Sequence, residues 1–355
     1  MSRFFSDKYR SLVPYTPGEQ PRDSRYVKLN TNESPFPPSE GVLRAVQAES
    51  GRLQLYSDPE CRALVEKIAE VYGVSPRQVM VNNGSDETLN FAFMAFADQD
   101  HPIVFPDITY GFYPVFARLN GIPFEEISLR EDFTIAAEDY RGIGKTVVFA
   151  NPNAPTGLCL SLEEIRGIVE SNPDNVVIVD EAYVDFGCES AVPLVKEFDN
   201  LLVVQTFSKS RSMAGARLGF CIGDEALIRD LNTIRFSTNP YNVNRMTLAA
   251  GVAALEENDY YMANCRVIAE NREYTAERLR SLGFTVLPSG SNFLFARTEK
   301  IPGGELYQKL KDRGVLVRHF SKPRIDPFIR VTIGTRQQMD VFLEITGMIL
   351  KEADR

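Results

Sequence analysis

The chain has 355 residues, of which 44% are hydrophobic and 25% are charged, close to the average for soluble globular proteins. This composition excludes an intrinsically disordered chain, a collagen-like fibre and a small disulfide-stapled domain. The formal net charge of −9 argues against a general affinity for nucleic acid or anionic membranes, although a few local cations would suffice for small anionic ligands.

The length exceeds what one hydrophobic core usually serves, so we expect a large domain and a smaller one. Cysteines are scattered at positions 61, 159, 188, 221 and 265 without a Cys-x-x-Cys pair, and the chain has only two histidines. This pattern is typical of ordinary thiols in a reducing compartment and argues against a disulfide framework or a metal centre. Because no apolar run reaches signal-peptide or membrane-span length, we expect a cytoplasmic protein.

Residues 1–35 are rich in proline and predict an irregular arm that belongs partly to the smaller domain. In residues 36–245, short apolar runs alternate with helical stretches. Strands are predicted at 79–82, 103–105, 146–150, 176–180, 201–207 and 218–223, and helices at 60–73, 86–98 and 161–172. This alternation predicts an α/β domain with a mostly parallel sheet covered by helices on both faces.

A long helical region is predicted over 243–282. Strand-like and helical pieces then follow at 284–288, 292–297, 305–314, 315–320, 328–334 and 337–353. They suit a smaller α+β domain, which we assign to residues 246–355.

Ligands of open parallel sheets bind at the carboxyl ends of the strands, so we expect the site in the turns after 82, 105, 150, 180 and 207. After the last of these turns, Lys209 stands among small residues and could act as an amine. Arg217 could hold a cofactor phosphate beside the hydroxyls of Thr206 and Ser208. Taken alone, the two cations also fit a solvated lysine and a salt-bridged arginine.

Asp180 ends a predicted buried strand, where a carboxylate is costly unless it meets a cation. The protonated ring nitrogen of pyridoxal phosphate is such a cation, and an aspartate partner keeps it protonated. Tyr183 could then hydrogen-bond the ring hydroxyl of the cofactor. The alternative is an aspartate that only caps the following turn.

Three other turns carry weaker signals. Gly84, Ser85 and Asp86 open a helix, where free amides and the helix dipole suit a phosphate, although an ordinary N-cap looks the same. Tyr110 could stack on a planar cofactor or pack as a half-buried aromatic. Residues 151–157 form a proline-rich turn that offers Asn153 to a ring substituent.

Residues 142–146 look like the end of a phosphate-binding P-loop. Position 139, where that motif has its first glycine, is Asp139, and the segment precedes a strand instead of following one. The structural context of a P-loop is therefore missing, which makes a nucleotide-binding function remote.

Along the chain the motifs follow the order of glycine-containing helix start, tyrosine, asparagine turn, aspartate with tyrosine, lysine and arginine. In this order they resemble the motifs of the fold-type I pyridoxal-phosphate aminotransferases. PYTPGEQP (14–21) and NTNESPFPP (30–38) narrow the resemblance to the histidinol-phosphate aminotransferase family, and it extends over nearly the whole chain. The resemblance implies pyridoxal 5'-phosphate as cofactor, histidinol phosphate and glutamate or 2-oxoglutarate as substrates, a role in histidine biosynthesis, and a homodimer.

The resemblance also assigns roles to residues. It makes Lys209 the lysine that bonds to the cofactor and carries protons, with Asp180 at the ring nitrogen and Tyr183 at the ring hydroxyl. The other implied cofactor contacts are Gly84, Ser85, Asp86, Tyr110, Asn153, Thr206, Ser208, Arg217 and, from the neighbouring subunit, Tyr56. The implied substrate contacts are Tyr15, Asn32, Arg318 and Arg330.

Two positions depart from the family pattern. The asparagine that usually precedes Pro-Thr-Gly is Ala154 here. Either the turn shifts and brings Asn153 to the ring hydroxyl, which we expect, or Tyr183 binds that hydroxyl alone. His319 replaces a more typical proline near the substrate pocket.

An aromatic aminotransferase or a phosphothreonine decarboxylase on the same scaffold remains an alternative, because the pocket residues do not separate these activities. A non-catalytic binding module is disfavoured by the intact set of Lys209, Asp180 and Arg217.

Overall fold

The computed structural model describes residues 2–10, 12–21 and 26–353. Positions 1, 11 and 22–25 of the predicted arm lie outside the described residues. The α-helices are α1 (Glu40–Ser50), α2 (Arg62–Tyr72), α3 (Ser85–Phe96), α4 (Tyr113–Asn120), α5 (Leu162–Glu170), α6 (Glu225–Thr238), α7 (Arg245–Glu256), α8 (Asn258–Ser281), α9 (Gly303–Asp312) and α10 (Arg336–Ala353). The strands are β1 (Val27–Lys28), β2 (Val79–Asn82), β3 (Ile103–Pro106), β4 (Phe124–Ile127), β5 (Thr146–Ala150), β6 (Val177–Asp180), β7 (Leu201–Thr206), β8 (Gly219–Gly223), β9 (Phe284–Val286), β10 (Phe293–Thr298), β11 (Val315–Leu316), β12 (Arg318–His319) and β13 (Ile329–Thr332).

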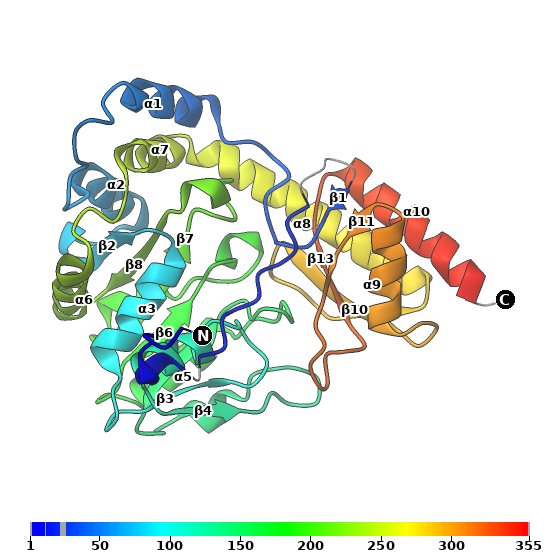
Figure 1. Ribbon diagram of the computed structural model, residues 1–355, viewed down its shortest axis with the longest axis horizontal. Coiled ribbons are helices and arrows are strands. Elements are labelled where there is room, and N and C mark those ends of the chain that lie inside the picture. The colour runs from blue at the N-terminus through cyan, green and yellow to red at the C-terminus, as the bar shows by residue number, and fades with distance from the viewer. Residues whose placement is uncertain (1, 11, 22–25, 354–355) are drawn as a thin grey trace.

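The large domain is built on a seven-stranded sheet with the order β2-β8-β7-β6-β5-β3-β4. Only β8 runs antiparallel to its neighbours. Every residue of β5, β6 and β7 is buried, because α2, α5 and α7 cover one face of the sheet while α3, α4 and α6 cover the other. The predicted mostly parallel α/β sheet is confirmed (Figure 1).

The smaller domain contains an antiparallel sheet with the order β12-β13-β10-β9. Helices α8, α9 and α10 pack on it around a separate hydrophobic core. In Figure 1, α8 leads from the large domain into this smaller one. The prediction of a smaller α+β domain is confirmed, whereas its bounds, 246–355, stay a prediction.

The region predicted as one long helical stretch, 243–282, is two helices that meet at Glu257. Glu257 has a non-helical ψ of 31°, and its carboxylate accepts a hydrogen bond from the Gly41 amide at 3.2 Å. This contact with the start of α1 accompanies the break in a sequence that otherwise favours continuous helix.

The N-terminal arm crosses from the large domain to the smaller one. In Figure 1 the dark blue chain runs between the two, and β1 pairs in parallel with β11. The arm therefore passes the edge of the large sheet where the site was predicted. No helix among the described residues is both long and apolar enough to span a membrane.

The prediction of ordinary thiols is wrong for two of the cysteines. Cys159 and Cys188 form a disulfide, with their Cα atoms 6.2 Å apart. They follow β5 and β6, which are neighbours in the sheet, so strand order brings together residues 29 positions apart. Cys61, Cys221 and Cys265 are buried thiols.

Candidate active site

The predicted motifs meet at one edge of the large sheet. Strands β2, β3, β5, β6 and β7 are parallel to one another, so their carboxyl ends and following turns lie together. Because β8 runs the opposite way, the residues that precede it join the same edge. This explains how Arg217, which precedes a strand, reaches turns that follow strands.

Arg217 lies against the N-terminus of α3. Its Nη2 is 3.2 Å from Asp86 Oδ2. Gly84, the N-cap of α3, has a φ of +85°, and a Cβ there would lie 2.6 Å from Arg217 Nη2. A glycine is therefore required at this turn for both backbone and space. A cation beside exposed helix amides is a suitable site for a phosphate group.

Two hydroxyls at the end of β7 stand beside this corner. Thr206 Oγ1 is 3.0 Å from Ser208 Oγ, and the Ser208 amide donates to Thr206 Oγ1 at 3.1 Å. Both side chains are buried. They belong to the set predicted to surround the phosphate.

Asp180, the last residue of β6, is only 4% exposed. Its Oδ2 accepts a hydrogen bond from Tyr113 at 2.9 Å and its Oδ1 accepts one from the Ala182 amide at 3.3 Å. Within the described residues it forms no ion pair, and burial raises its pKa to about 6, against the smaller effect of the Tyr113 hydrogen bond. A buried carboxylate without a protein cation fits a cationic ring nitrogen.

Tyr110 contacts the carboxylate of Asp86, which also pairs with Arg217. Its hydroxyl donates to Asp86 Oδ1 at 2.7 Å, and burial together with Asp86 raises its pKa well above the ordinary value. The ring of Tyr15 stacks on Phe112 at 4.2 Å and lies 6.4 Å from the ring of Tyr110. The arm thus places an aromatic side chain beside Tyr110, and the predicted contact of Tyr15 with the substrate stays a prediction.

Lys209 extends toward the arm. Its Nζ donates to the Thr31 carbonyl at 3.1 Å and lies 5.7 Å from the centre of the Tyr183 ring. The hydroxyl of Tyr183 accepts from the Asn32 side-chain amide at 3.0 Å. Asn32 is almost completely buried and is also bound through Thr332, so its amide orients Tyr183.

Asn153 is a buried residue of the turn after β5. Its Oδ1 accepts from the Thr109 hydroxyl at 2.8 Å, and its Nδ2 donates to the Ile108 carbonyl at 2.9 Å and to Thr156 Oγ1 at 3.2 Å. These bonds connect the turns after β3 and β5. The predicted contact of Asn153 with the ring hydroxyl stays a prediction.

Two arginines of the smaller domain form a cationic pair. Arg318 and Arg330 stand directly opposite each other on β12 and β13, an arrangement that is unfavourable for like charges unless an anion compensates them. Arg318 donates to the arm carbonyls of Thr16 and Pro17. Arg330 donates to Asn30 O, and its buried Nε has no partner in the part of the chain that the structure describes. Burial lowers the pKa of Arg330.

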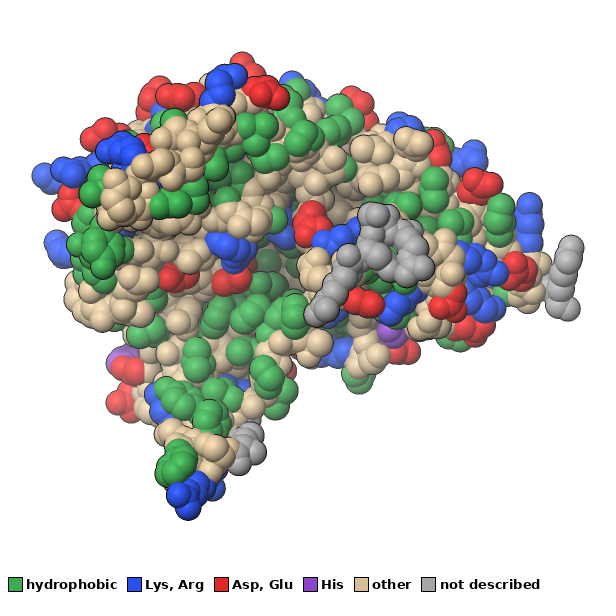
Figure 2. Space-filling model, turned by 45° about the horizontal axis from the view of Figure 1, so that its top comes forward, with side chains coloured by type: hydrophobic (Ala, Val, Ile, Leu, Met, Phe, Trp, Pro, Cys, Tyr) green, Lys and Arg blue, Asp and Glu red, His purple; other side chains and the backbone are tan. Residues whose placement is uncertain are grey.

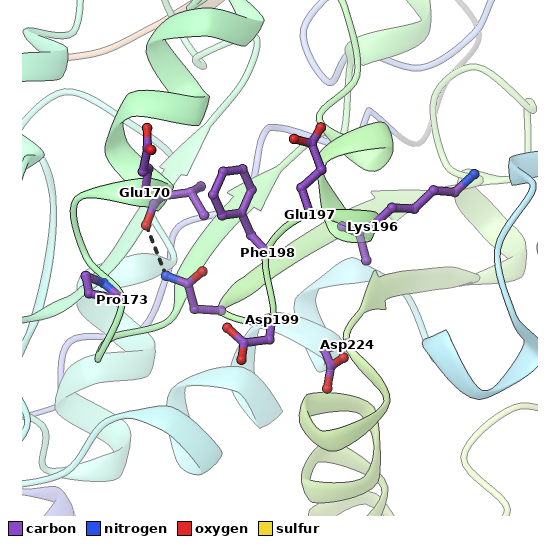
Figure 3. A pocket seen from close by; sticks show the side chains of 10 residues that line it. Glu170, Pro173, Lys196, Glu197, Phe198, Asp199 and Asp224 are labelled. Carbon is purple, nitrogen blue, oxygen red and sulfur yellow. Dashed lines mark hydrogen bonds between the residues drawn. The ribbon is translucent and has the colours of Figure 1, made fainter.

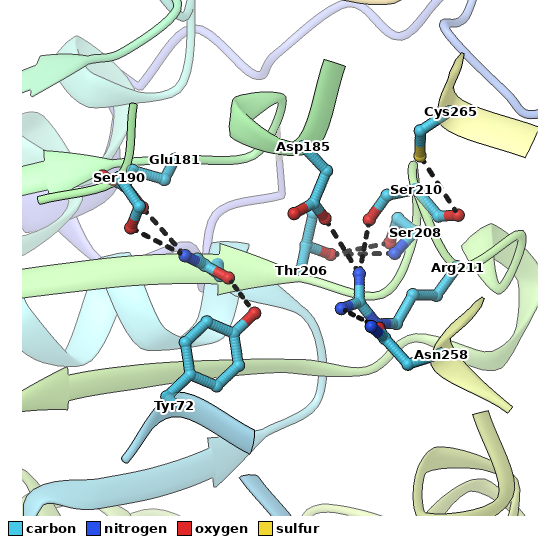
Figure 4. Close-up of polar contacts among 11 residues, drawn as sticks. Tyr72, Glu181, Asp185, Ser190, Thr206, Ser208, Ser210, Arg211, Asn258 and Cys265 are labelled. Carbon is cyan, nitrogen blue, oxygen red and sulfur yellow. Dashed lines mark hydrogen bonds and ion pairs between the residues drawn. The ribbon is translucent and has the colours of Figure 1, made fainter. Parts of the chain in front are cut away.

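Arg211, two residues after Lys209, forms an ion pair and hydrogen bonds with neighbouring segments (Figure 4). This guanidinium is buried and pairs with Asp185 at 2.8 Å, in the short helix η4 (Val184–Phe186) that follows Tyr183. It also donates to Asn258 at the start of α8 at 2.9 Å. The lysine loop, the Tyr183 loop and the helix leading to the smaller domain are thereby connected.

A separate hollow of about 460 Å³ lies at the opposite edge of the sheet (Figure 3). It is lined by the end of α5, by residues 195–200 before β7 and by Asp224 after β8. Four carboxylates and Lys196 surround it, and it contains none of the predicted site residues. Its position at the amino ends of the parallel strands does not fit a site of this fold.

Sequence reasoning missed Tyr113 and the Thr31 carbonyl. Tyr113 lies three residues after Tyr110, but only the folded structure brings its hydroxyl to the end of β6, and a backbone carbonyl leaves no mark in a sequence.

Residues 24–345 match the profile of the family described as aminotransferase class I and II. A histidinol-phosphate aminotransferase from Brachyspira hyodysenteriae is 49% identical over 353 residues, which cover 99% of this chain and 100% of that protein. The chain belongs to the histidinol-phosphate aminotransferase family.

Solved structures agree with this fold. Histidinol-phosphate aminotransferase from Sinorhizobium meliloti, solved in complex with pyridoxal-5'-phosphate, has a TM-score of 0.87 and 22% identity, over 99% of both chains. L-threonine-O-3-phosphate decarboxylase from Porphyromonas gingivalis has a TM-score of 0.81 and 20% identity, over 91% of this chain and 99% of that one. At these identities the likeness shows the fold of this chain, and it does not show which substrate the chain binds.

Proposed function

We propose that this protein transfers the amino group of histidinol phosphate to 2-oxoglutarate, giving imidazole acetol phosphate and glutamate in histidine biosynthesis. The observation that carries the reaction type is that Lys209 and the buried carboxylate of Asp180, which forms no ion pair with any described residue, follow or end neighbouring parallel strands at the same edge of the sheet. The near full-length similarity to histidinol-phosphate aminotransferases supports the substrate.

The residues of this edge fit pyridoxal 5'-phosphate. Arg217, the α3 N-terminus and the Thr206 and Ser208 hydroxyls would hold its phosphate, and Asp180 would face its ring nitrogen. When bound, the cofactor supplies an electron sink for charge that develops on the substrate α-carbon.

Side chains of the protein would then hold and transfer the protons of the reaction. Asp180 would keep the ring nitrogen protonated, and Tyr183, oriented by Asn32, would donate to the ring oxygen. Lys209 acts as general acid and base at Nζ, moving the α-proton of the substrate. Tyr110, whose hydroxyl donates to Asp86, would lie against the cofactor ring.

Arg318 and Arg330 would bind the anionic end of either substrate. Both donors and acceptors in this reaction carry a phosphate or a carboxylate, and paired guanidinium groups bind such anions by bidentate contacts. The unpartnered Nε of Arg330 and the like charge opposite it support this role.

We further propose a homodimer in the cytoplasm. Tyr56 is 80% exposed and stacks on Tyr241, with ring centres 4.4 Å apart, which suits a side chain that reaches a neighbouring subunit. The cytoplasmic location rests on the proposed biosynthetic role.

The deciding experiment is a single-turnover titration of the cofactor-loaded protein, followed through the near-visible absorption of the bound cofactor. Histidinol phosphate added without a keto acid should abolish this band at low concentration, and 2-oxoglutarate should then restore it. Phenylalanine and phosphothreonine serve as comparison amines. A response to either of them instead would assign the sister activity, and no band after addition of pyridoxal phosphate would refute the role of Lys209.

A further inference from the structure

A tyrosine outside all the predicted site motifs contacts the key carboxylate. Tyr113, the first residue of α4, is completely buried, and its hydroxyl donates to Asp180 Oδ2 at 2.9 Å. The other carboxylate oxygen has only the longer contact with the Ala182 amide, at 3.3 Å. Tyr113 therefore provides the shorter of the two hydrogen bonds that orient Asp180.

The phenol can act only as a donor to Asp180. Burial and the neighbouring Asp180 charge raise the pKa of Tyr113 well above its ordinary value, so it keeps its proton. Its ring is enclosed by Phe93, Phe105 and Tyr110, with centres 6.3, 5.8 and 5.7 Å away. This packing fixes the direction of the hydroxyl.

The other groups around Asp180 do not provide the same support. Asp86, at the start of α3, carries a like charge that raises the pKa of Asp180, as burial does. The neighbouring strands β5 and β7 place Ala150 and Val204 beside it, and neither titrates. Among the described residues, Tyr113 is thus the side chain whose hydrogen bond favours the ionised carboxylate.

We infer that Tyr113 is a positioning residue for the reaction, which orients the Asp180 carboxylate and stabilises its charge so that the cofactor proton stays on the ring nitrogen. The inference rests on the proposed function, because that function places the ring nitrogen at Asp180. Tyr113 acts through Asp180 and needs no contact with cofactor or substrate.

The test compares Tyr113→Phe with Tyr140→Phe. Tyr140 is also a fully buried tyrosine, but its hydroxyl has no hydrogen-bond partner among the described residues and it packs on the other face of the sheet. In the holoenzyme, Tyr113→Phe should lower kcat roughly ten- to a hundredfold and leave KM within about twofold, as expected for a lost hydrogen bond to a charged group that acts in the transition state. Tyr140→Phe should keep the wild-type kcat.

Two readouts do not depend on turnover. The cofactor is labelled with 15N at its ring nitrogen. In the Tyr113→Phe holoenzyme, the 15N chemical shift of this atom should lie closer to the value of an unprotonated ring nitrogen than it does in wild type. In the apoprotein, the raised pKa of Asp180 makes stability fall as pH rises from about 4 to about 6. Without the Tyr113 donor this fall should continue to higher pH.

Unchanged kcat, 15N shift and pH dependence in Tyr113→Phe would overturn the inference, as would equal losses in the two variants. If Tyr113→Phe does not fold, 3-fluorotyrosine at position 113 keeps the donor and makes it more acidic, so the fall in apoprotein stability should end at lower pH. No such shift would also overturn the inference. Failure of wild type on histidinol phosphate would refute the proposed substrate alone, since the apoprotein measurement needs no substrate.

Discussion

Lys209 places its amine 3.1 Å from the Thr31 carbonyl, and this is its only hydrogen bond among the described contacts. Replacing it with alanine should therefore cost little stability. Lys209→Ala should abolish multiple-turnover transamination, because both the bond to the cofactor and the moving proton need this amine. Steady-state rates together with thermal melting would show an inactive, folded protein.

The matched control is Lys196→Ala, which removes an exposed lysine at the opposite edge of the sheet and should keep full activity. Multiple turnovers by the Lys209→Ala protein would sink the assignment. An unfolded Lys209→Ala protein would show instead that the amine is structural.

At the scale of residues, sequence reasoning located the groups that follow strands and missed those that act through contacts. Lys209, Asp180 and Arg217 were predicted from their positions at strand ends, and the structure brings them to one edge. Tyr113 could not be predicted, because its partner is 67 residues away and only the packing of α4 brings the two together.

The end of β6 carries two successive buried carboxylates that face different surroundings. Asp180 faces the site, whereas Glu181 accepts from Ser190, the Ala191 amide and Gln205, whose own side chain accepts from Tyr72 (Figure 4). Burial raises the pKa of Glu181 to about 7, against the lowering effect of these donors.

A raised pKa means that the folded protein binds more protons than the unfolded chain between pH 4.5 and about 7. The stabilising contribution of Glu181 is therefore complete below this window and is lost as pH rises through it. In Glu181→Gln, the total loss of unfolding free energy of the apoprotein across this pH range should be smaller than in wild type by roughly 2–3 kcal/mol. Urea unfolding at several pH values would measure it. Glu126→Gln, at an exposed position of β4, should leave the slope unchanged, and an unchanged slope in Glu181→Gln would contradict the assignment.

The two loops that follow β5 and β6 are joined by Cys159 and Cys188, and they also carry Asn153 and Tyr183. Denatured protein should therefore show three titratable thiols before reduction and five after treatment with dithiothreitol. In Cys159→Ser the four remaining thiols should titrate with or without reductant. Five thiols in untreated wild type would show that the two cysteines are not bonded.

At the scale of elements, prediction succeeded where burial is complete. Strands β5, β6 and β7 are buried throughout and mostly apolar, and they were found with small errors at their ends. Strand β4 was missed because it pairs only with β3 at the edge of the sheet and includes two exposed glutamates. The cysteine pair was missed because it depends on the order of strands in the sheet, which periodicity does not reveal.

The whole molecule exposes large hydrophobic side chains on its large domain, visible in green in Figure 2. Leu53, Leu55 and Tyr56 are all more than half exposed, and Tyr56 stacks on Tyr241, which is itself exposed. Exposed apolar side chains gathered in this way are typical of a protein–protein contact. The proposed homodimer would cover these side chains and bring Tyr56 to the partner's proposed phosphate site.

Mixed dimers test this arrangement directly. Lys209→Ala removes the amine of its own site, whereas Tyr56→Ala removes a group given to the neighbouring site. When the two variants, each of low activity, are unfolded together and refolded, each mixed dimer has one site with both mutations and one with neither. Since about half of randomly formed dimers are mixed, the mixture should regain about one quarter of wild-type activity. A mixture that is dimeric by light scattering but regains no activity would place Tyr56 in its own subunit's site.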